Sequence, residues 1–472
     1  MSFKKLIGTR TFYRGLLAVM VPILIQNGIT NFISLLDNVM VGQVGTDQMS
    51  GVSIVNQLMF VFYLCIFGAI SGAGLFGAQF FGKRDHEGVR HTFRFKLIIS
   101  LGLMAAAIGV FLVWGEPLVS LYLNEGGETG SVEMTMHYAK QYLWLSLIGL
   151  VPYTVTQVYS STLREIGHTV PPMAAGLAGV FVNLVLNYVL IFGHLGAPAL
   201  GVEGAAIATV ISRFAECVLV ILWAHLNPHK CEFIKGVYRS LYVPGVLIKR
   251  IMVLGMPLLI NEALWSMGQA ALLRNYSVYG LATVSAMNIS NTVSNTFAVL
   301  YMAVGSAIAI LLGHLLGAGK IEEARDSARK MIAFSCAMGA VAGVLVMLCA
   351  PLFPHLYNTT DEVRRLAMQL MLVVGASTPL HSFAHSTYFT LRSGGKTWIT
   401  FIFDSGYAWC VSVAVTYALV KWTALPVVAV YAVCNFIDLF KCLGGAYLVG
   451  RGGWAKNITA DATEPSSAPA ES

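Results

Sequence analysis

The stretch SGVSIVNQLMFVFYLCIFGAISGAGLFGAQFF, residues 50 to 81, contains no charged side chain. A helix needs roughly 20 apolar residues to cross about 30 Å of hydrocarbon, so this run is long enough to span a membrane. The whole chain shares its character, because 56% of the 472 residues are hydrophobic, 11% are charged and the mean hydropathy is +0.70. Soluble domains carry about 25% charged residues. The sequence therefore predicts a polytopic membrane protein.

Twelve such apolar runs divide the chain. They lie near residues 13–38, 48–80, 95–115, 137–160, 170–193, 204–226, 250–276, 283–314, 331–352, 365–390, 397–420 and 424–449. We therefore expect an all-α fold of twelve transmembrane helices in two six-helix bundles. The expected segments are an N-terminal bundle (1–226), a cytoplasmic linker (227–249), a C-terminal bundle (250–452) and a disordered cytoplasmic tail (453–472).

Charge placement predicts the orientation and excludes several functions. Lys and Arg collect in alternate loops, such as those around Lys83 and Lys320, which the positive-inside rule assigns to the cytoplasm. Both termini are then cytoplasmic. The net charge of +7 does not indicate nucleic-acid binding, since no basic patch with interleaved aromatic residues occurs in the sequence. The eight cysteines lack metal-ligand spacing, and no Walker A, HExxH or GxSxG motif marks an enzyme.

The two halves of the chain repeat each other. A shift of 235 residues aligns VPILI (21–25) with MPLLI (256–260), and a shift of 228 aligns LREIGHT (163–169) with LRSGGKT (391–397). Each half has an even number of predicted spans, so the halves point the same way, related by an axis along the membrane normal. A cleft between such halves is where a transported molecule would sit.

Three stretches carry a family resemblance: LLDNVMVGQVGTDQMSGVSI (35–54), VFVNLVLNYVLIFGHLGAPALGVEGAAIATVI (180–211) and MPLLINEALW (256–265). Their order and spacing resemble bacterial NorM-like members of the multidrug and toxic compound extrusion (MATE) family, over residues 10–450. The resemblance implies a monomeric antiporter of the bacterial cytoplasmic membrane, without cofactor. It would export cationic or amphipathic organic compounds by alternating access in exchange for protons, the favoured ion, or sodium. The alternatives are a flippase or exporter of lipid-linked saccharides or other solutes and, less favoured, a membrane enzyme.

Asp37 is the acid of the first predicted span. It lies 23 residues beyond Arg14, near the outer end, where it could be an ordinary helix-end acid in contact with water. The resemblance instead places it in a cavity with Asn183 and Asn187, which share one helix face at i, i+4 spacing. A carboxylate in a partly dehydrated cavity can carry a proton at cellular pH. The two asparagines could also simply join helices.

Glu262 is the deepest acid of the second half. It lies 12 residues beyond Arg250, near mid-membrane, where ionisable residues are functional candidates by default. It matches the seventh-helix Glu that NorM-like relatives use for cation coupling. Those relatives carry an Asp in the tenth helix where this chain has His381. Imidazole is a poor ligand for sodium but titrates near neutral pH, which favours protons.

Further polar residues surround these acids. His381 and His385 share a helix face, and the 228-residue shift pairs them with Tyr153 and Gln157, so all four are candidate proton-handling or substrate-contacting residues. An interhelical hydrogen-bonding role is equally compatible. No Cys or third His recurs with zinc-ligand spacing, so we expect no metal site. Asp404 is expected near the cytoplasmic end of its span, and Asp438 with Lys441 as a self-neutralising i, i+3 pair.

Overall fold

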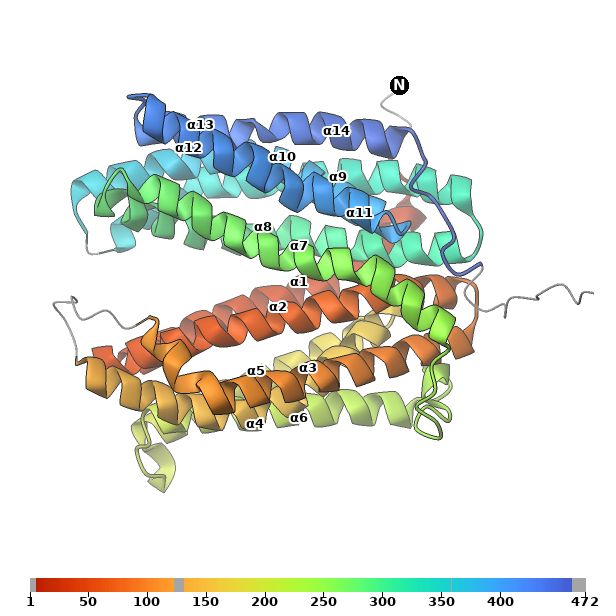
Figure 1. The fold of residues 1–472 in the computed structure, drawn as a ribbon, viewed down its shortest axis with the longest axis horizontal. Coiled ribbons are helices and arrows are strands. Elements are labelled where there is room, and N and C mark those ends of the chain that lie inside the picture. Colours follow the sequence, from red (N-terminus) through yellow and green to blue (C-terminus); the bar gives the residue numbers. More distant parts are fainter. Residues whose placement is uncertain (1–5, 123–130, 358, 461–472) are drawn as a thin grey trace, which may run out of the picture. The chain divides into compact units, whose positions relative to one another are not determined.

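A computed structural model describes residues 6–122, 131–357 and 359–460, although the side chains of residues 31–39 and 46 lie outside the described part. The described chain contains helices and no strands (Figure 1). The long helices are α1 (Arg10–Gly42), α2 (Thr46–Gly82), α3 (His86–Ser120), α4 (Val132–Glu165), α5 (Val170–Phe192), α6 (Val202–Leu226), α7 (Gly245–Ser277), α8 (Leu281–Gly317), α9 (Ile321–Cys349) and α10 (Asp361–Ser393). The shorter ones are η2 (His194–Gly196), η3 (Glu232–Ile234), η4 (Phe353–Leu356), α11 (Thr397–Phe401), η5 (Ile402–Gly406), η6 (Ala408–Val413), α12 (Ala414–Trp422), α13 (Val427–Phe436) and α14 (Asp438–Gly450).

These helices supply the expected spans. Within the described residues, ten spans are long and apolar enough to cross a membrane. One of them runs from α11 through α12, and another comprises α13 and α14. Helices α4 and α7 are not among these ten spans but are similarly long, with 34 and 33 residues. Local chemistry sets the helix ends: Ser131 and Thr360 accept hydrogen bonds from backbone N–H groups of the first turns of α4 and α10.

The chain forms two compact units. Unit 1 comprises residues 1–24, 78–85 and 249–472, and unit 2 comprises residues 25–77 and 86–248. In unit 1, α10 packs against both α8 and α9. A continuous apolar core there joins the start of α1, through Leu16 and Met20, to α8, α9 and Trp454. The first turns of α1 are therefore part of the core that contains the last helices of the chain.

The end of α2 crosses α8 within unit 1 at unusually short range. A Cβ on Gly317 would collide with the backbone carbonyl of Gln79, and a Cβ on Gly82 would collide with that of His314. Gln79 also donates to the Ser393 carbonyl at 2.9 Å and accepts from the Ile458 N–H at 2.8 Å. Glycines at the crossing let the two backbones meet, and Gln79 joins them to the chain end.

The start of the expected tail is part of unit 1. Trp454 is fully buried, and its indole N–H donates to the Val449 carbonyl at 3.2 Å. Asn457 donates to the Gly317 carbonyl at 3.3 Å. Composition assigned residues 453–460 to a disordered segment because they are small and polar, but one large apolar side chain anchors them. Residues 461–472 lie outside the described part.

The linker between the predicted halves folds onto α3 in unit 2. Arg94 donates to the carbonyls of Val237 at 2.8 Å, Gly236 at 3.0 Å and Tyr242 at 3.3 Å. Phe233 packs on Phe93 with ring centroids 5.2 Å apart. Arg94 is a buried residue of α3 that positions the linker, and it is not part of the basic loop after α2.

Candidate functional site

A group of ionisable side chains inside unit 1 gathers where two helices depart from regular α-helical geometry. The span that begins with α11 contains π-helical segments, the first of which, η5, includes Asp404. The last span breaks at Ile437, just before Asp438. The Tyr407 hydroxyl donates to the Ile437 carbonyl at 2.6 Å, so the break is satisfied internally. Such irregular turns within helices frequently mark functional sites.

Asp404 and Lys441 form the firmest contact of this group. The Lys441 ammonium lies 2.8 Å from Asp404 Oδ1, and Asn261 donates to Asp404 Oδ2 at 3.1 Å. Ser405 donates to Asn261 Oδ1 at 2.7 Å and fixes the amide orientation. Lys441 therefore pairs with Asp404 on another helix, and not with Asp438 as the i, i+3 spacing suggested. Asp404 thus lies with Asn261, the residue that precedes Glu262.

Glu262, the central residue of the sequence hypothesis, has no hydrogen bond or ion pair among the described residues. It lies within electrostatic range of Arg392 and Asp404. Arg392 is buried, with its guanidinium over the rings of Phe389 at 5.3 Å and Tyr388 at 5.9 Å. The Glu262 carboxylate is thus partly buried beside a cation that is stacked on aromatic faces, and its oxygens are available to another ligand.

The two histidines occupy different surroundings in this group. His381 Nε2 lies 3.6 Å from Asp438 Oδ2, so the chain places a carboxylate beside the residue that replaces the relatives' Asp. His385 lies one turn on, with its ring 4.9 Å from Phe389 and 5.8 Å from Tyr301. Its Nε2 is buried without a hydrogen bond among the described residues. Both sequence-predicted histidines therefore point into the same region as Asp404 and Lys441.

We call these seven residues the charge cluster: Glu262, His381, His385, Arg392, Asp404, Asp438 and Lys441. It contains three carboxylates and two permanent cations. With both imidazoles neutral, the cluster has one negative charge in excess. A partly buried group with one excess negative charge can accept a proton or a small cation. No group of three or more metal-ligating side chains suited to a metal ion occurs among the described residues.

Unit 2 contains an aromatic site with its own ion pair. Tyr153 on α4 packs against Tyr63 on α2, with ring centroids 4.5 Å apart. The Arg213 guanidinium lies 5.0 Å above the Tyr153 ring and 3.6 Å from Glu216, the i, i+3 partner that its spacing indicated. Gln157 lies one turn after Tyr153 and is half-buried. This face shows that a cation can sit on Tyr153, because Arg213 already does.

Asn183 and Asn187 lie together in the same unit. Both are buried on α5, the Asn187 amide donates to Asn183 Oδ1 at 3.1 Å, and Asn183 donates to Thr209 on α6 at 3.4 Å. The i, i+4 spacing thus gives a direct hydrogen bond, and Thr209 joins the pair to α6. Asp37 lies on α1, in the stretch whose side chains are outside the described residues.

Lys96 and Glu165 form a buried pair that the sequence did not reveal. The Lys96 ammonium is 0% exposed and lies 2.6 Å from both Glu165 oxygens, with Thr162 at 3.2 Å. Gly74 and Gly77 on α2 make room for the carboxylate, since a Cβ on either would collide with it. The apolar run expected near residues 95–115 places Lys96 at the very start of its span. Helix α3 begins ten residues earlier, at His86.

Solved structures share this fold. An outward-facing multidrug resistance MATE family transporter of the MOP superfamily matches with a TM-score of 0.82 and 18% identity, covering 95% of this chain and 98% of that one. A MATE protein in the straight conformation matches with a TM-score of 0.83 and 20% identity over the same shares. The expected all-α polytopic fold, with twelve transmembrane helices in two lobes, is thereby confirmed.

Sequence comparisons identify the family. The probable multidrug resistance protein YoeA of Bacillus subtilis (strain 168) is 25% identical over 89% of each chain. The probable multidrug resistance protein NorM of Halalkalibacterium halodurans is 28% identical over 75% of this chain and 76% of its own. The MatE family model matches residues 22–189 and 257–418, which is more than half of the chain and includes parts of both predicted bundles. The chain therefore belongs to the MatE family of multi-span membrane transporters.

Proposed function

We propose that the protein is a secondary antiporter that exports cationic or amphipathic organic compounds from the bacterial cytoplasm in exchange for protons. The observation that carries the proposal is the charge cluster of unit 1, with its excess carboxylate and the uncommitted Glu262. The relatives are named as multidrug resistance proteins, which supports the class of exported compound. We propose that it acts as a monomer without a cofactor, with sodium as the second candidate ion.

The cluster suggests how a proton would be used. Both Asp404 oxygens are already bound, one by Lys441 and the other by Asn261. Glu262 lacks such partners and is the carboxylate best placed to bind the entering ion. His381 and Asp438 form a second exchangeable contact at 3.6 Å. Uptake of one positive charge neutralises the excess, and this change in charge would favour a different packing of the broken helices around Asp404 and Ile437.

The aromatic site of unit 2 supports binding of the organic substrate. An organic cation could take the place over Tyr153 that Arg213 occupies, while Tyr63 provides a second ring. Glu216, which lies 3.6 Å from Arg213, would offer its charge to that cation. A substrate recognised by aromatic faces and one carboxylate needs only an apolar body and a positive charge, which is compatible with many compounds.

We further propose that Asp37 couples protons in the N-terminal half, with Asn183 and Asn187 as hydrogen-bonding neighbours. Protonation from outside would weaken the attraction for a cationic substrate and release it, and deprotonation to the cytoplasm would restore binding. Linkage then requires that substrate binding expel protons. Asp37→Asn should abolish pH-driven export and flatten the pH dependence of substrate affinity while the protein still folds. If Asp37→Asn still exported substrate at the wild-type rate, proton coupling would be assigned to unit 1.

The direct test is ethidium transport in proteoliposomes under an imposed pH gradient and, separately, under an imposed sodium gradient. We expect the pH gradient alone to drive transport. Glu262→Gln should reduce the initial rate at least ten-fold, because the neutral amide cannot exchange a proton. The matched control is Glu322→Gln, at an 82% exposed acid of the same unit paired with Arg325 on its own helix.

Three outcomes would contradict the proposal. Transport driven by sodium alone would replace the proton by sodium. Wild-type rates from Glu262→Gln would remove Glu262 from coupling. Absence of ethidium transport under either gradient, combined with transport of a lipid-linked saccharide, would favour the flippase class.

A further inference from the structure

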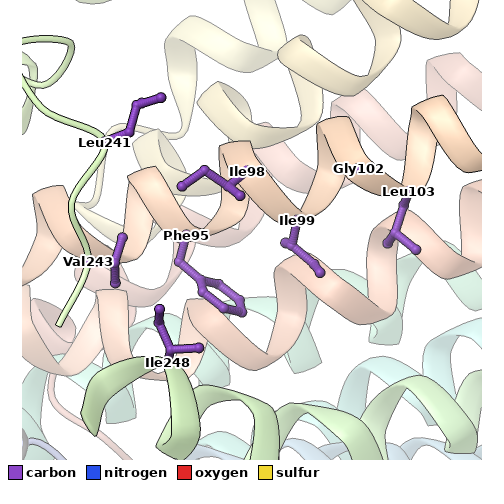
Figure 2. Close-up of a pocket in the computed structure, with 8 residues that line it drawn as sticks. All are labelled: Phe95, Ile98, Ile99, Gly102, Leu103, Leu241, Val243 and Ile248. Carbon is purple, nitrogen blue, oxygen red and sulfur yellow. The ribbon is translucent and has the colours of Figure 1, made fainter. Parts of the chain in front are cut away.

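An apolar groove lies between α3 on one side and the linker with the first turn of α7 on the other, outside both sites described above (Figure 2). Five residues of α3 form one wall, and Leu241, Val243 and Ile248 form the other (Figure 2). The α3 residues are Phe95, Ile98, Ile99, Gly102 and Leu103. They recur every three or four positions, so they share one helix face. The groove has a volume of about 620 Å³ and is lined by apolar side chains and one glycine.

The groove opens at the outer surface of unit 2. Ile98 is 47% exposed and Leu241 is 58% exposed. Among the candidate spans, α3 has the most apolar window and the least buried one, so its outer surface is suited to contact with lipid chains. The end of α3 that carries Phe95 is close to the basic loop after α2 and so, by the charge distribution, close to the membrane surface.

Hydrogen bonds within the protein hold the linker in place beside α3, and so hold the groove open. Arg94, directly before Phe95, binds three carbonyls of the linker on both sides of Leu241. Tyr159 and Tyr238 form a further hydroxyl–hydroxyl hydrogen bond between α4 and the linker. These contacts fix the second wall relative to α3. An occupant therefore meets a preformed groove and does not have to order the linker.

The linker beside the groove is basic. Lys230, Lys235 and Arg239 are exposed, and Arg239 lies two residues before the groove residue Leu241. The linker's acid, Glu232, lies 3.2 Å from His86. An exposed apolar groove, one wall of which follows a basic segment of the chain, matches a molecule with a hydrocarbon chain and an anionic head. Anionic lipids of the cytoplasmic leaflet combine these features.

We propose that this groove binds an acyl chain of an anionic phospholipid, whose phosphate lies against the basic residues of the linker. The chain fills the space between α3 and Leu241, Val243 and Ile248. The headgroup adds a tether between the linker and the bilayer. The linker joins the two predicted bundles. The bound lipid therefore attaches this connecting segment to the membrane surface.

Two glycines of α3 provide a matched test. Gly102 lines the groove, and a Cβ there meets no atom within 4 Å, so a larger side chain enters the groove without a clash at its base. Gly109 lies two turns further along the same helix, has equally open space and does not line the groove. Gly102→Phe and Gly109→Phe make the same change in helix propensity and surface apolarity. Only the first blocks the groove.

The measurement is native mass spectrometry of the purified full-length protein in detergent, titrated with phosphatidylglycerol or with phosphatidylcholine of the same chains. We expect wild type and Gly109→Phe to retain one phosphatidylglycerol, Gly102→Phe to retain it at least ten-fold less, and phosphatidylcholine to be retained weakly. Lys235→Gln/Arg239→Gln should reduce retention of phosphatidylglycerol towards that of phosphatidylcholine. If Gly102→Phe is not monodisperse, Leu241→Asp tests the same groove from the linker.

Several results would overturn the proposal. Equal retention by the two phenylalanine variants would show that the groove does not bind the lipid. Equal retention of the two lipids by wild type would remove the anionic headgroup from the recognition. Displacement of phosphatidylglycerol by micromolar ethidium would make the groove a site for exported compounds instead.

Discussion

The buried pair of Lys96 and Glu165 allows a quantitative test of what stabilises unit 2. Lys96→Met removes the ammonium that donates to both carboxylate oxygens at 2.6 Å. Hydrogen bonds to charged groups contribute about 1.5–3 kcal/mol each. Removing one partner of a buried pair costs about 3–5 kcal/mol, because a charge then stays in a low-dielectric surrounding. We therefore expect Lys96→Met to lower the free energy of unfolding by about 3–5 kcal/mol.

The double variant Lys96→Met/Glu165→Gln separates burial of a charge from loss of packing. It removes both charges at nearly constant volume, and such replacements of buried pairs are often close to neutral. We expect it to recover most of the stability that Lys96→Met loses. The measurement is urea unfolding of the purified protein in detergent, followed by tryptophan fluorescence for wild type, both single variants and the double variant.

Lys140 and Glu116 supply the control. They make an ion pair at the same 2.6 Å distance in the same unit, but their side chains are 36% and 61% exposed. Exposed pairs contribute about 0.2–1 kcal/mol, so Lys140→Met should change the free energy of unfolding by no more than that. The reasoning would be refuted if Lys96→Met cost as little as Lys140→Met, or if the two single-variant losses at Lys96 and Glu165 simply added in the double variant.

Three further predictions concern orientation, packing and the linker. A cysteine at exposed Lys320 should react with an impermeant maleimide only from the cytoplasm, and labelling from outside would contradict the twelve-span orientation. Gly317→Leu should lower the free energy of unfolding by at least about 1–3 kcal/mol because its Cβ meets an α2 carbonyl, whereas Gly444→Leu, in open space, should cost less; equal losses in thermal unfolding would argue against the close crossing. Burial in the linker raises the pKa of the Cys231 thiol to about 11, so in a variant that keeps only this cysteine, near pH 7, Cys231 should react on the order of 100-fold more slowly with maleimide than it does after urea unfolding, and comparable rates would show that the linker is undocked.

The sequence by itself determined the class of the protein and predicted the direction of each span. Hydrocarbon thickness requires long apolar runs, and backbone hydrogen bonds must be satisfied inside the membrane, so composition and run length lead to helices. Glu262 could be identified as a functional candidate from the sequence because an acid in a mid-membrane position carries a high free-energy cost. The i, i+4 pair of Asn183 and Asn187 follows from helical geometry alone.

Only the tertiary structure decided which charges meet. Lys441 pairs with Asp404 and His381 with Asp438, although helical spacing favoured Asp438 with Lys441. Lys96 meets Glu165, which lies 69 positions away in the chain, so no local spacing could have paired the two residues. Short-range spacing fixes which residues share a helix face, but contacts between helices depend on helix rotation and on local departures from regular geometry, and a single sequence encodes these only through the packing of the whole unit.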